Sequence, residues 1–269
     1  MKIVVDDVSY HVEVYGQGVP LLLLHGFTGE SSTWHPFIPM WKKDFQLIMI
    51  DIIGHGKTAS PLNESKYNIV VAAKHLVEIL QALQINSIYL LGYSMGGRLA
   101  LTFSILYPHY VQKLILESAS PGLKTTEQQQ ERRIQDKKLG ESILVEGIGQ
   151  FVEKWEEIPL FQTQKKLNQK QRDKIRTQRL QNNAAGLANS LIGMGTGVQP
   201  SWWEHLHEVP FRTLLITGEL DNKFCLIAKE MVNKNTGFTW KMVEDAGHAI
   251  HVEKPEIFGT IVSGFLSNH

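Results

Sequence analysis

Hydrophobic residues in this chain follow two patterns, short continuous runs and longer stretches in which they recur every three or four positions. The continuous runs, rich in Leu, Ile and Val, cover residues 20–24, 45–50, 87–93, 113–117 and 213–217. Such runs are typical of strands that are covered on both faces of a parallel sheet. The helical spacing appears at about 68–83, 223–234 and 255–267, and again directly after Ser94.

Two further segments complete a predicted sheet. Residues 2–15 alternate between apolar and polar side chains, which predicts two antiparallel strands, and residues 239–243 read as a last strand. Strands that alternate with helices indicate a parallel arrangement. We therefore expect an α/β fold with a mostly parallel eight-stranded sheet and helices on both faces.

The alternation is interrupted once. Residues 121–205 contain several helical stretches and no clear strand, and residues 124–182 carry 13 Lys and Arg against 9 Asp and Glu. We interpret 121–205 as a helical cap inserted after the sixth strand, and 1–120 with 206–269 as the core. Pro121-Gly122 and Val209-Pro210 are the expected points at which the cap leaves and rejoins the sheet.

Composition excludes several classes of protein. The formal net charge is +0, so no overall field favours nucleic acid or a membrane surface. Cys225 is the single cysteine, which rules out an intrachain disulfide. The start lacks the apolar core of a signal peptide, and no apolar run is long enough to span a bilayer. We expect a cytoplasmic protein with no stable membrane insertion and, since no metal-ligand motif occurs, no metal.

The most informative motif is Gly92-Tyr93-Ser94-Met95-Gly96, which joins a predicted strand to a predicted helix. In this context Gly-x-Ser-x-Gly predicts a sharp turn that exposes the serine as a nucleophile. The turn also places Ser94 at a helix N-terminus, where backbone N–H groups can stabilise developing negative charge.

A nucleophilic serine needs a histidine and an orienting carboxylate. Asp221 follows the strand 213–217 and His248 follows the strand 239–243, so both lie on loops at the carboxyl ends of strands. The predicted triad is Ser94, Asp221 and His248. Glu219 is the alternative acid, but it lies closer to its strand end.

Two backbone N–H groups are expected to form an oxyanion hole. One belongs to Met95, directly after the nucleophile, and the other to Phe27, in the loop after the strand 20–24. His25 is expected to fix this loop by hydrogen bonding and not to react.

The motifs identify the chain as similar to the α/β-hydrolase superfamily over its whole length. His25-Gly26-Phe27-Thr28-Gly29, Gly92 to Arg98, Ser120-Pro121-Gly122-Leu123 and Arg179-x-x-Asn182-Asn183 further resemble the SHCHC synthases of menaquinone biosynthesis. The resemblance implies an α/β-hydrolase fold and a lyase whose triad eliminates pyruvate from SEPHCHC, a cyclohexene that bears succinyl, enolpyruvyl and carboxylate groups. It also implies a small polycarboxylate as partner, and neither a metal nor an organic cofactor.

Arg98 lies four residues after Ser94, one helical turn on and on the same face. A cation in the first turn opposes the helix dipole, and an anionic substrate would offset that cost. The resemblance adds Tyr93, Arg132, Trp155 and Arg179 as substrate-binding residues.

Three arginines would suit three carboxylates. Arg133 is adjacent to Arg132 and could take its place, so the sequence leaves this choice open.

Other functions remain compatible with the motifs. A carboxylesterase or a carbon–carbon bond hydrolase would use the same triad, and a ligand receptor could share the fold. The arginine set argues against a neutral ester, and an intact triad argues against a receptor. Ser94 at the nucleophile position disfavours haloalkane dehalogenases and epoxide hydrolases, which carry Asp there.

Overall fold

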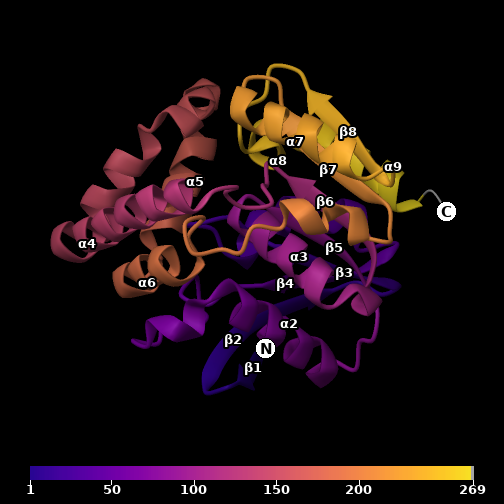
Figure 1. Cartoon of the computed structure of the whole chain (residues 1–269), viewed down its shortest axis with the longest axis horizontal. Helices are drawn as coiled ribbons and strands as arrows, with labels where there is room; N and C mark the ends of the chain where they lie inside the picture. The colour runs from indigo at the N-terminus through magenta and orange to yellow at the C-terminus, as the bar shows by residue number, and fades with distance from the viewer. Residues whose placement is uncertain (268–269) are drawn as a thin grey trace.

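The computed structural model describes residues 1–267 and contains one eight-stranded sheet, whose spatial order is β1-β2-β4-β3-β5-β6-β7-β8 (Figure 1). The strands β1 and β2 pair antiparallel, as does β2 with β4, and every other neighbouring pair is parallel. The strands are β1 (Lys2–Val5), β2 (Val8–Tyr15), β3 (Val19–Leu24), β4 (Phe45–Ile50), β5 (Ile88–Tyr93), β6 (Val111–Glu117), β7 (Thr213–Gly218) and β8 (Phe238–Val243).

The helices alternate with these strands except in the segment between β6 and β7. The α-helices are α1 (Ile38–Trp41), α2 (Ile69–Ala82), α3 (Met95–Leu106), α4 (Thr126–Glu156), α5 (Gln169–Leu180), α6 (Ala184–Met194), α7 (Asn222–Lys234), α8 (Ile250–Glu253) and α9 (Pro255–Ser267). Short 3₁₀ helices are η1 (Ser31–Phe37), η2 (Glu64–Tyr67), η3 (Pro108–Tyr110), η4 (Pro159–Lys166) and η5 (Trp203–Glu208).

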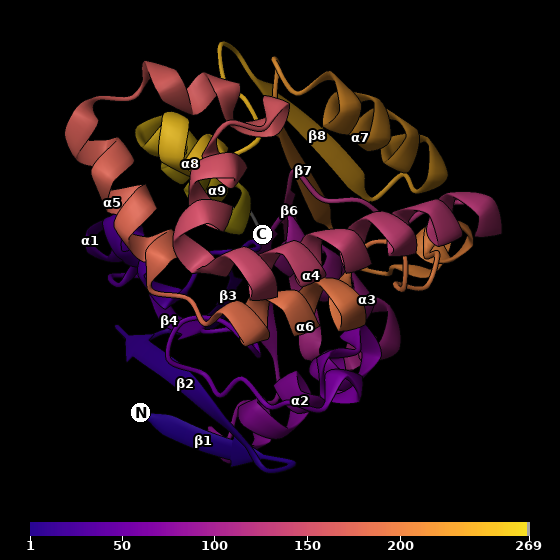
Figure 2. The ribbon, with the colours of Figure 1, turned by 90° about the vertical axis from the view of Figure 1, so that its left-hand side faces the viewer.

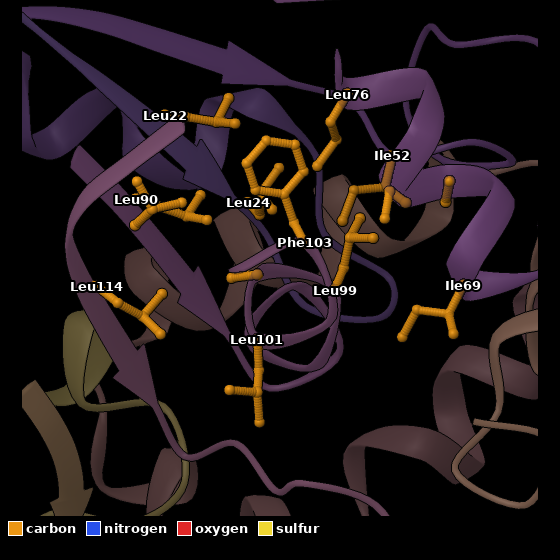
Figure 3. Close-up of a cluster of buried hydrophobic side chains, with 14 of the residues drawn as sticks. Leu22, Leu24, Ile52, Ile69, Leu76, Leu90, Leu99, Leu101, Phe103 and Leu114 are labelled. Atoms are coloured by element: carbon orange, nitrogen blue, oxygen red, sulfur yellow. The ribbon is translucent and has the colours of Figure 1, made fainter. Parts of the chain in front are cut away.

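Side chains of the central strands alternate between two hydrophobic layers, because successive residues of a strand point to opposite faces. Leu22 and Leu24 of β3 belong to the layer covered by α2, α3 and α7, whereas Leu21 and Leu23 belong to the layer covered by η1, α1 and α9. Figure 3 shows Leu22 and Leu24 gathered near Phe103 of α3 in the first layer. Burial on both faces explains why these strands read as continuous apolar runs.

The predicted elements agree with the structure to within one or two residues. The strand predicted at 45–50 is β4, and the helices predicted at 68–83, 223–234 and 255–267 are α2, α7 and α9. The mostly parallel eight-stranded sheet with helices on both faces is confirmed. No helix within residues 1–267 combines the length and the apolar character that a bilayer span requires.

The segment between β6 and β7 contributes α4, η4, α5 and α6, which lie together on one side of the molecule (Figure 1). Figure 2 shows α4 and α6 side by side. The two ends of the segment meet, since the Trp202 N–H donates to the Pro121 oxygen at 2.8 Å and the Trp203 indole N–H to the Gly122 oxygen at 3.0 Å. Its definition as a cap over residues 121–205 stays a prediction.

Candidate active site

The turn between β5 and α3 holds Ser94 in a strained backbone. Ser94 has φ 51° and ψ −107°, in a region that non-glycine residues rarely adopt. A Cβ at Gly92 would collide with the Gly96 carbonyl, and one at Gly96 with the His25 carbonyl. Both glycines are therefore required by close backbone approach, and the turn leaves the serine at the N-terminus of α3.

Ser94, Asp221 and His248 meet at the carboxyl ends of three strands. The Ser94 hydroxyl lies 2.9 Å from His248 Nε2, and Asp221 Oδ2 lies 2.6 Å from His248 Nδ1. A carboxylate at Nδ1 holds the proton there and leaves Nε2 free to accept the serine proton. Asp221 also caps α7 through the Phe224 N–H at 3.5 Å, so one carboxylate positions both the helix and the imidazole.

Other acids and a histidine near the triad (Glu219, Asp245 and His251) have different partners. Glu219 Oε2 accepts the Asp245 N–H at 3.0 Å, and the Asp245 carboxylate pairs with two lysines on the surface. His251 Nδ1 lies 2.9 Å from the buried Glu117 carboxylate. The geometry therefore brings Asp221, and not Glu219, to His248.

The loop that carries Phe27 is fixed by His25. The His25 Nδ1–H donates to the Gly26 oxygen at 2.8 Å, and Nε2 accepts the Ile52 N–H at 2.9 Å. Burial lowers the pKa of His25 to about 4, so the ring is neutral at pH 7. Both ring nitrogens are occupied, which agrees with a structural role.

A cavity of about 210 Å³ lies between the strand ends and the segment 121–205. Its wall includes Ser94, His248 and the two expected oxyanion donors, Phe27 and Met95. No Asp or Glu is among its lining residues in the described part of the chain. The remaining wall is formed by Tyr93, Arg98, Ser118, Ser120, Gly122, Leu123, Arg132, Trp155, Leu160, Phe161, Ser190, Leu191, Gly195, Thr196, Lys223, Phe224 and Ile227.

Two polar atoms of this wall are buried without a hydrogen-bond partner within residues 1–267, the Trp155 Nε1 and the Ser118 Oγ. A buried donor that lacks a partner is costly, so both atoms favour a polar group or a water molecule beside them. The same range contains no group of three His, Cys, Asp or Glu side chains that could hold a metal ion.

A family model described as the α/β hydrolase fold matches residues 19–255. The chain belongs to the α/β-hydrolase family. This membership accounts for the sheet order and for the serine on a turn between a strand and a helix.

Several relatives of this α/β-hydrolase share a name. A Bacillus subtilis protein, provisionally named 2-succinyl-6-hydroxy-2,4-cyclohexadiene-1-carboxylate synthase, is 45% identical over 98% of this chain and 96% of its own length. A Salmonella typhimurium protein of that name is 30% identical, over 88% of this chain and 90% of its own length. The structure of MenH from S. aureus superposes with a TM-score of 0.91 at 38% identity, covering 96% of this chain and 97% of that one.

Other α/β-hydrolases share the architecture at lower identity. A thermophilic esterase from Thermogutta terrifontis superposes with a TM-score of 0.84 at 24% identity, over 96% of this chain and 93% of the esterase. At that identity the likeness shows the fold alone.

Arg98 of this α/β-hydrolase lies in the cavity wall, and its partners are neutral. Its guanidinium donates to the Met194 oxygen at 2.7 Å and to Gln199 Oε1 at 2.8 Å. Burial lowers the pKa of Arg98 to about 10, and the nearby Arg132 adds to the effect. Asp136 acts in the opposite direction and raises the pKa of Arg98, but no carboxylate of residues 1–267 lies at ion-pair distance from this guanidinium. The group is charged at pH 7, and partly burying a cation that has no ion-pair partner is unfavourable.

Arg132 lines the cavity, whereas Arg133 does not. The Arg132 Nε donates to Asp136 Oδ1 at 2.7 Å, and the Arg133 Nε donates to the Gly197 oxygen at 2.7 Å. Of these two neighbours, the structure therefore places Arg132 at the site.

Arg179 does not line the cavity of about 210 Å³ that contains Ser94 and His248, which we call the catalytic cavity. Arg179 lines an adjacent cavity of about 480 Å³, with its guanidinium 4.8 Å from the Phe161 ring centroid and 3.5 Å from Glu156. Phe161, Tyr93 and Phe27 line both cavities and form their shared wall. A role of Arg179 in substrate binding stays a prediction.

The two aromatic residues predicted at the site both line the catalytic cavity. The Tyr93 ring lies 5.5 Å from the His248 ring, and burial raises the pKa of its phenol well above the usual range. The phenol is therefore a neutral hydrogen-bond donor. The Trp155 ring packs edge-on against Phe27 at 5.4 Å while its N–H stays unpaired.

Three residues of the site have no strong signal in the sequence. Phe224 packs on His248 with ring centroids 4.7 Å apart, and Ser118 and Lys223 line the cavity. Their one sequence clue is their position, because each follows a strand end within a few residues.

Proposed function

We propose that this α/β-hydrolase is an SHCHC synthase, a lyase that removes a proton from SEPHCHC and eliminates pyruvate. The observation that carries the proposal is Arg98, a half-buried cation one helical turn from Ser94 whose hydrogen-bond acceptors are neutral, in a cavity lined by no acidic residue. A substrate carboxylate would supply the missing anion. The name borne by the relatives supports the same reaction.

The proposed mechanism uses the triad as a base. Asp221 orients His248, and the Ser94–His248 pair takes a proton from the substrate ring, which the succinyl carbonyl activates. The electron pair of the broken C–H bond moves toward that carbonyl, and the N–H groups of Phe27 and Met95 hold the resulting oxyanion.

The electron pair then returns to form a double bond to the neighbouring ring carbon, the ring double bond already present shifts by one position, and the bond from the ring to the enolpyruvyl oxygen breaks. The leaving group takes up a proton and departs as pyruvate. No bond to Ser94 is formed, and no electrons pass to another molecule, so the mechanism calls on neither an acyl-enzyme nor a redox cofactor.

We further propose that the segment 121–205 acts as a cap that covers the substrate. It supplies Arg132 and Trp155 to the cavity wall, while the core supplies Ser94, His248, Tyr93 and Arg98. Closure by such a segment would exclude water and strengthen the electrostatic contacts of the site.

A carboxylesterase is the second candidate, because a serine bonded to a histidine beside two oxyanion donors also suits acyl transfer. Parallel turnover of SEPHCHC and of p-nitrophenyl acetate separates the two reactions. We expect pyruvate release to be faster than nitrophenol release by at least about a thousandfold in kcat/KM, since only SEPHCHC offers carboxylates to the cations. Preferred turnover of the neutral ester would overturn the proposal.

A further inference from the structure

Lys223 contributes a third cation to the catalytic cavity, and it comes from α7, a helix that carries neither Arg98 nor Arg132. It lies in the first turn of α7, two residues after Asp221, and lines the cavity together with Arg98 and Arg132. Arg98 comes from α3 and Arg132 from α4. Cations from three separate helices therefore face one small space.

The charge of Lys223 is not neutralised by the protein. Within residues 1–267 no carboxylate lies at ion-pair distance from its ammonium group, and its nearest aromatic ring is that of Phe224, with the centroid 5.5 Å away. Lys223 is an exposed residue, but the protein around its ammonium group partly desolvates it and so lowers its pKa. Repulsion from Arg132 lowers the pKa further, while Asp221 acts in the opposite direction. The ammonium group and the Arg132 guanidinium line the same cavity of about 210 Å³, where two positive charges repel each other.

Only part of the Arg132 guanidinium is used in the contact with Asp136. Its Nε donates to Asp136, so the terminal nitrogens keep hydrogen-bonding capacity toward the cavity. Two cations that repel each other across a cavity are stabilised when an anion lies between them, since each gains an attraction in place of the repulsion.

We propose that Lys223 is a substrate-binding residue that shares one substrate carboxylate with Arg132, and so links the core to the segment 121–205 when substrate is bound. The assignment rests on the proposed function, and it identifies Lys223 and Arg132 as the groups that bind one carboxylate of the substrate. Arg98, one helical turn from Ser94, then binds a different carboxylate of the substrate. Lys223 thereby sets specificity for a polyanionic substrate over a neutral one.

The test is steady-state pyruvate release from SEPHCHC by the Lys223→Gln variant. We expect KM to rise about tenfold or more with kcat changed only a few-fold, because a charge-assisted contact to bound substrate is lost. Lys223→Arg keeps the charge and should recover most of the affinity. Lys229→Gln is the matched control, because Lys229 is also an exposed lysine of α7 but does not line the cavity, and it should leave KM unchanged.

A double-mutant cycle tests whether the carboxylate is shared. If Lys223 and Arg132 hold one carboxylate, the combined Lys223→Gln and Arg132→Gln variant should have a smaller KM increase than the product of the single effects. An unchanged KM in Lys223→Gln, or fully multiplicative effects, would overturn the assignment. Failure of the proposed function is a different result, visible as absence of pyruvate release by the unmodified enzyme before any variant is compared, and it would remove this assignment too.

Discussion

The Arg98 guanidinium and the Gln199 amide oxygen are 2.8 Å apart, and this contact keeps a half-buried cation in place without cancelling its charge. Gln199 is almost fully buried, at 1% exposure. A carboxylate at this position would form an internal ion pair instead. The neutral amide therefore leaves the positive charge available to a ligand.

Replacing Gln199 by Glu should weaken substrate binding while preserving the shape of the site. We expect the KM for SEPHCHC to rise about tenfold or more, because the new carboxylate competes with the substrate for Arg98. Steady-state kinetics on Gln199→Glu checks this, with the exposed Gln150→Glu as a control for added negative charge. A KM equal to that of the unmodified enzyme would show that Arg98 does not bind substrate.

The adjacent arginines of α4 offer a second comparison. Arg132→Gln should raise KM about tenfold or more, since it removes a cation from the cavity wall. Arg133→Gln should change KM by less than about twofold, because that side chain donates to the Gly197 oxygen outside the wall. The same kinetic assay on both variants decides the matter, and an effect of Arg133 as large as that of Arg132 would refute the assignment.

Asp221 and Glu219 form a matched pair of acids around β7. Asp221→Asn should lower kcat by about a thousandfold or more, because an amide no longer fixes the His248 tautomer or stabilises the imidazolium. Glu219→Gln should leave kcat within about threefold, since its carboxylate contacts the Asp245 N–H and not His248. Thermal unfolding of both variants controls for misfolding. A loss of kcat in Glu219→Gln as large as that in Asp221→Asn would contradict the assignment of Asp221 as the acid of the triad.

The buried histidines predict how stability depends on pH. Burial lowers the pKa of His25 to about 4 and that of His55 to about 3, from 6.5. Between pH 6.5 and pH 4 the unfolded chain therefore binds more protons than the folded one. The free energy of unfolding should fall by a few kcal/mol as pH falls through this window, and it should be insensitive to these groups above pH 7.5.

Denaturant unfolding at a series of pH values measures this slope. His25→Asn, which keeps a donor and an acceptor, should flatten the decrease between pH 6.5 and 4. His207→Gln, at an exposed position, should leave the decrease in the free energy of unfolding unchanged. A slope that His25→Asn does not reduce would show that folding does not lower the pKa of this histidine.

Local patterns predicted the sheet well, and they indicated which side chains approach one another at the strand ends, because each of these features depends on a few neighbouring residues. A run such as Phe45–Ile50 is a strand wherever two layers cover it, and Ser94, Asp221 and His248 each follow a strand end. The sequence thus contained the order of the elements and the approach of these three side chains.

The arginines and Lys223 depend on tertiary packing that no local pattern encodes. Whether Arg132 or Arg133 faces the site depends on how α4 packs, and α4 has few buried positions to reveal its inner face. Arg179 contacts Glu156 and Phe161, two residues of neighbouring elements of the same segment. Such contacts form only when the whole segment is folded, so sequence position alone could not show which of the two cavities Arg179 lines.

The most direct test of the proposed function is pyruvate release from freshly prepared SEPHCHC by the unmodified enzyme and by Ser94→Ala. The account predicts rapid release of one pyruvate per substrate consumed, and a rate near the spontaneous one for the variant, whose fold should be unchanged by circular dichroism. Release no faster than the spontaneous rate with the unmodified enzyme, or equal release by Ser94→Ala, would contradict it.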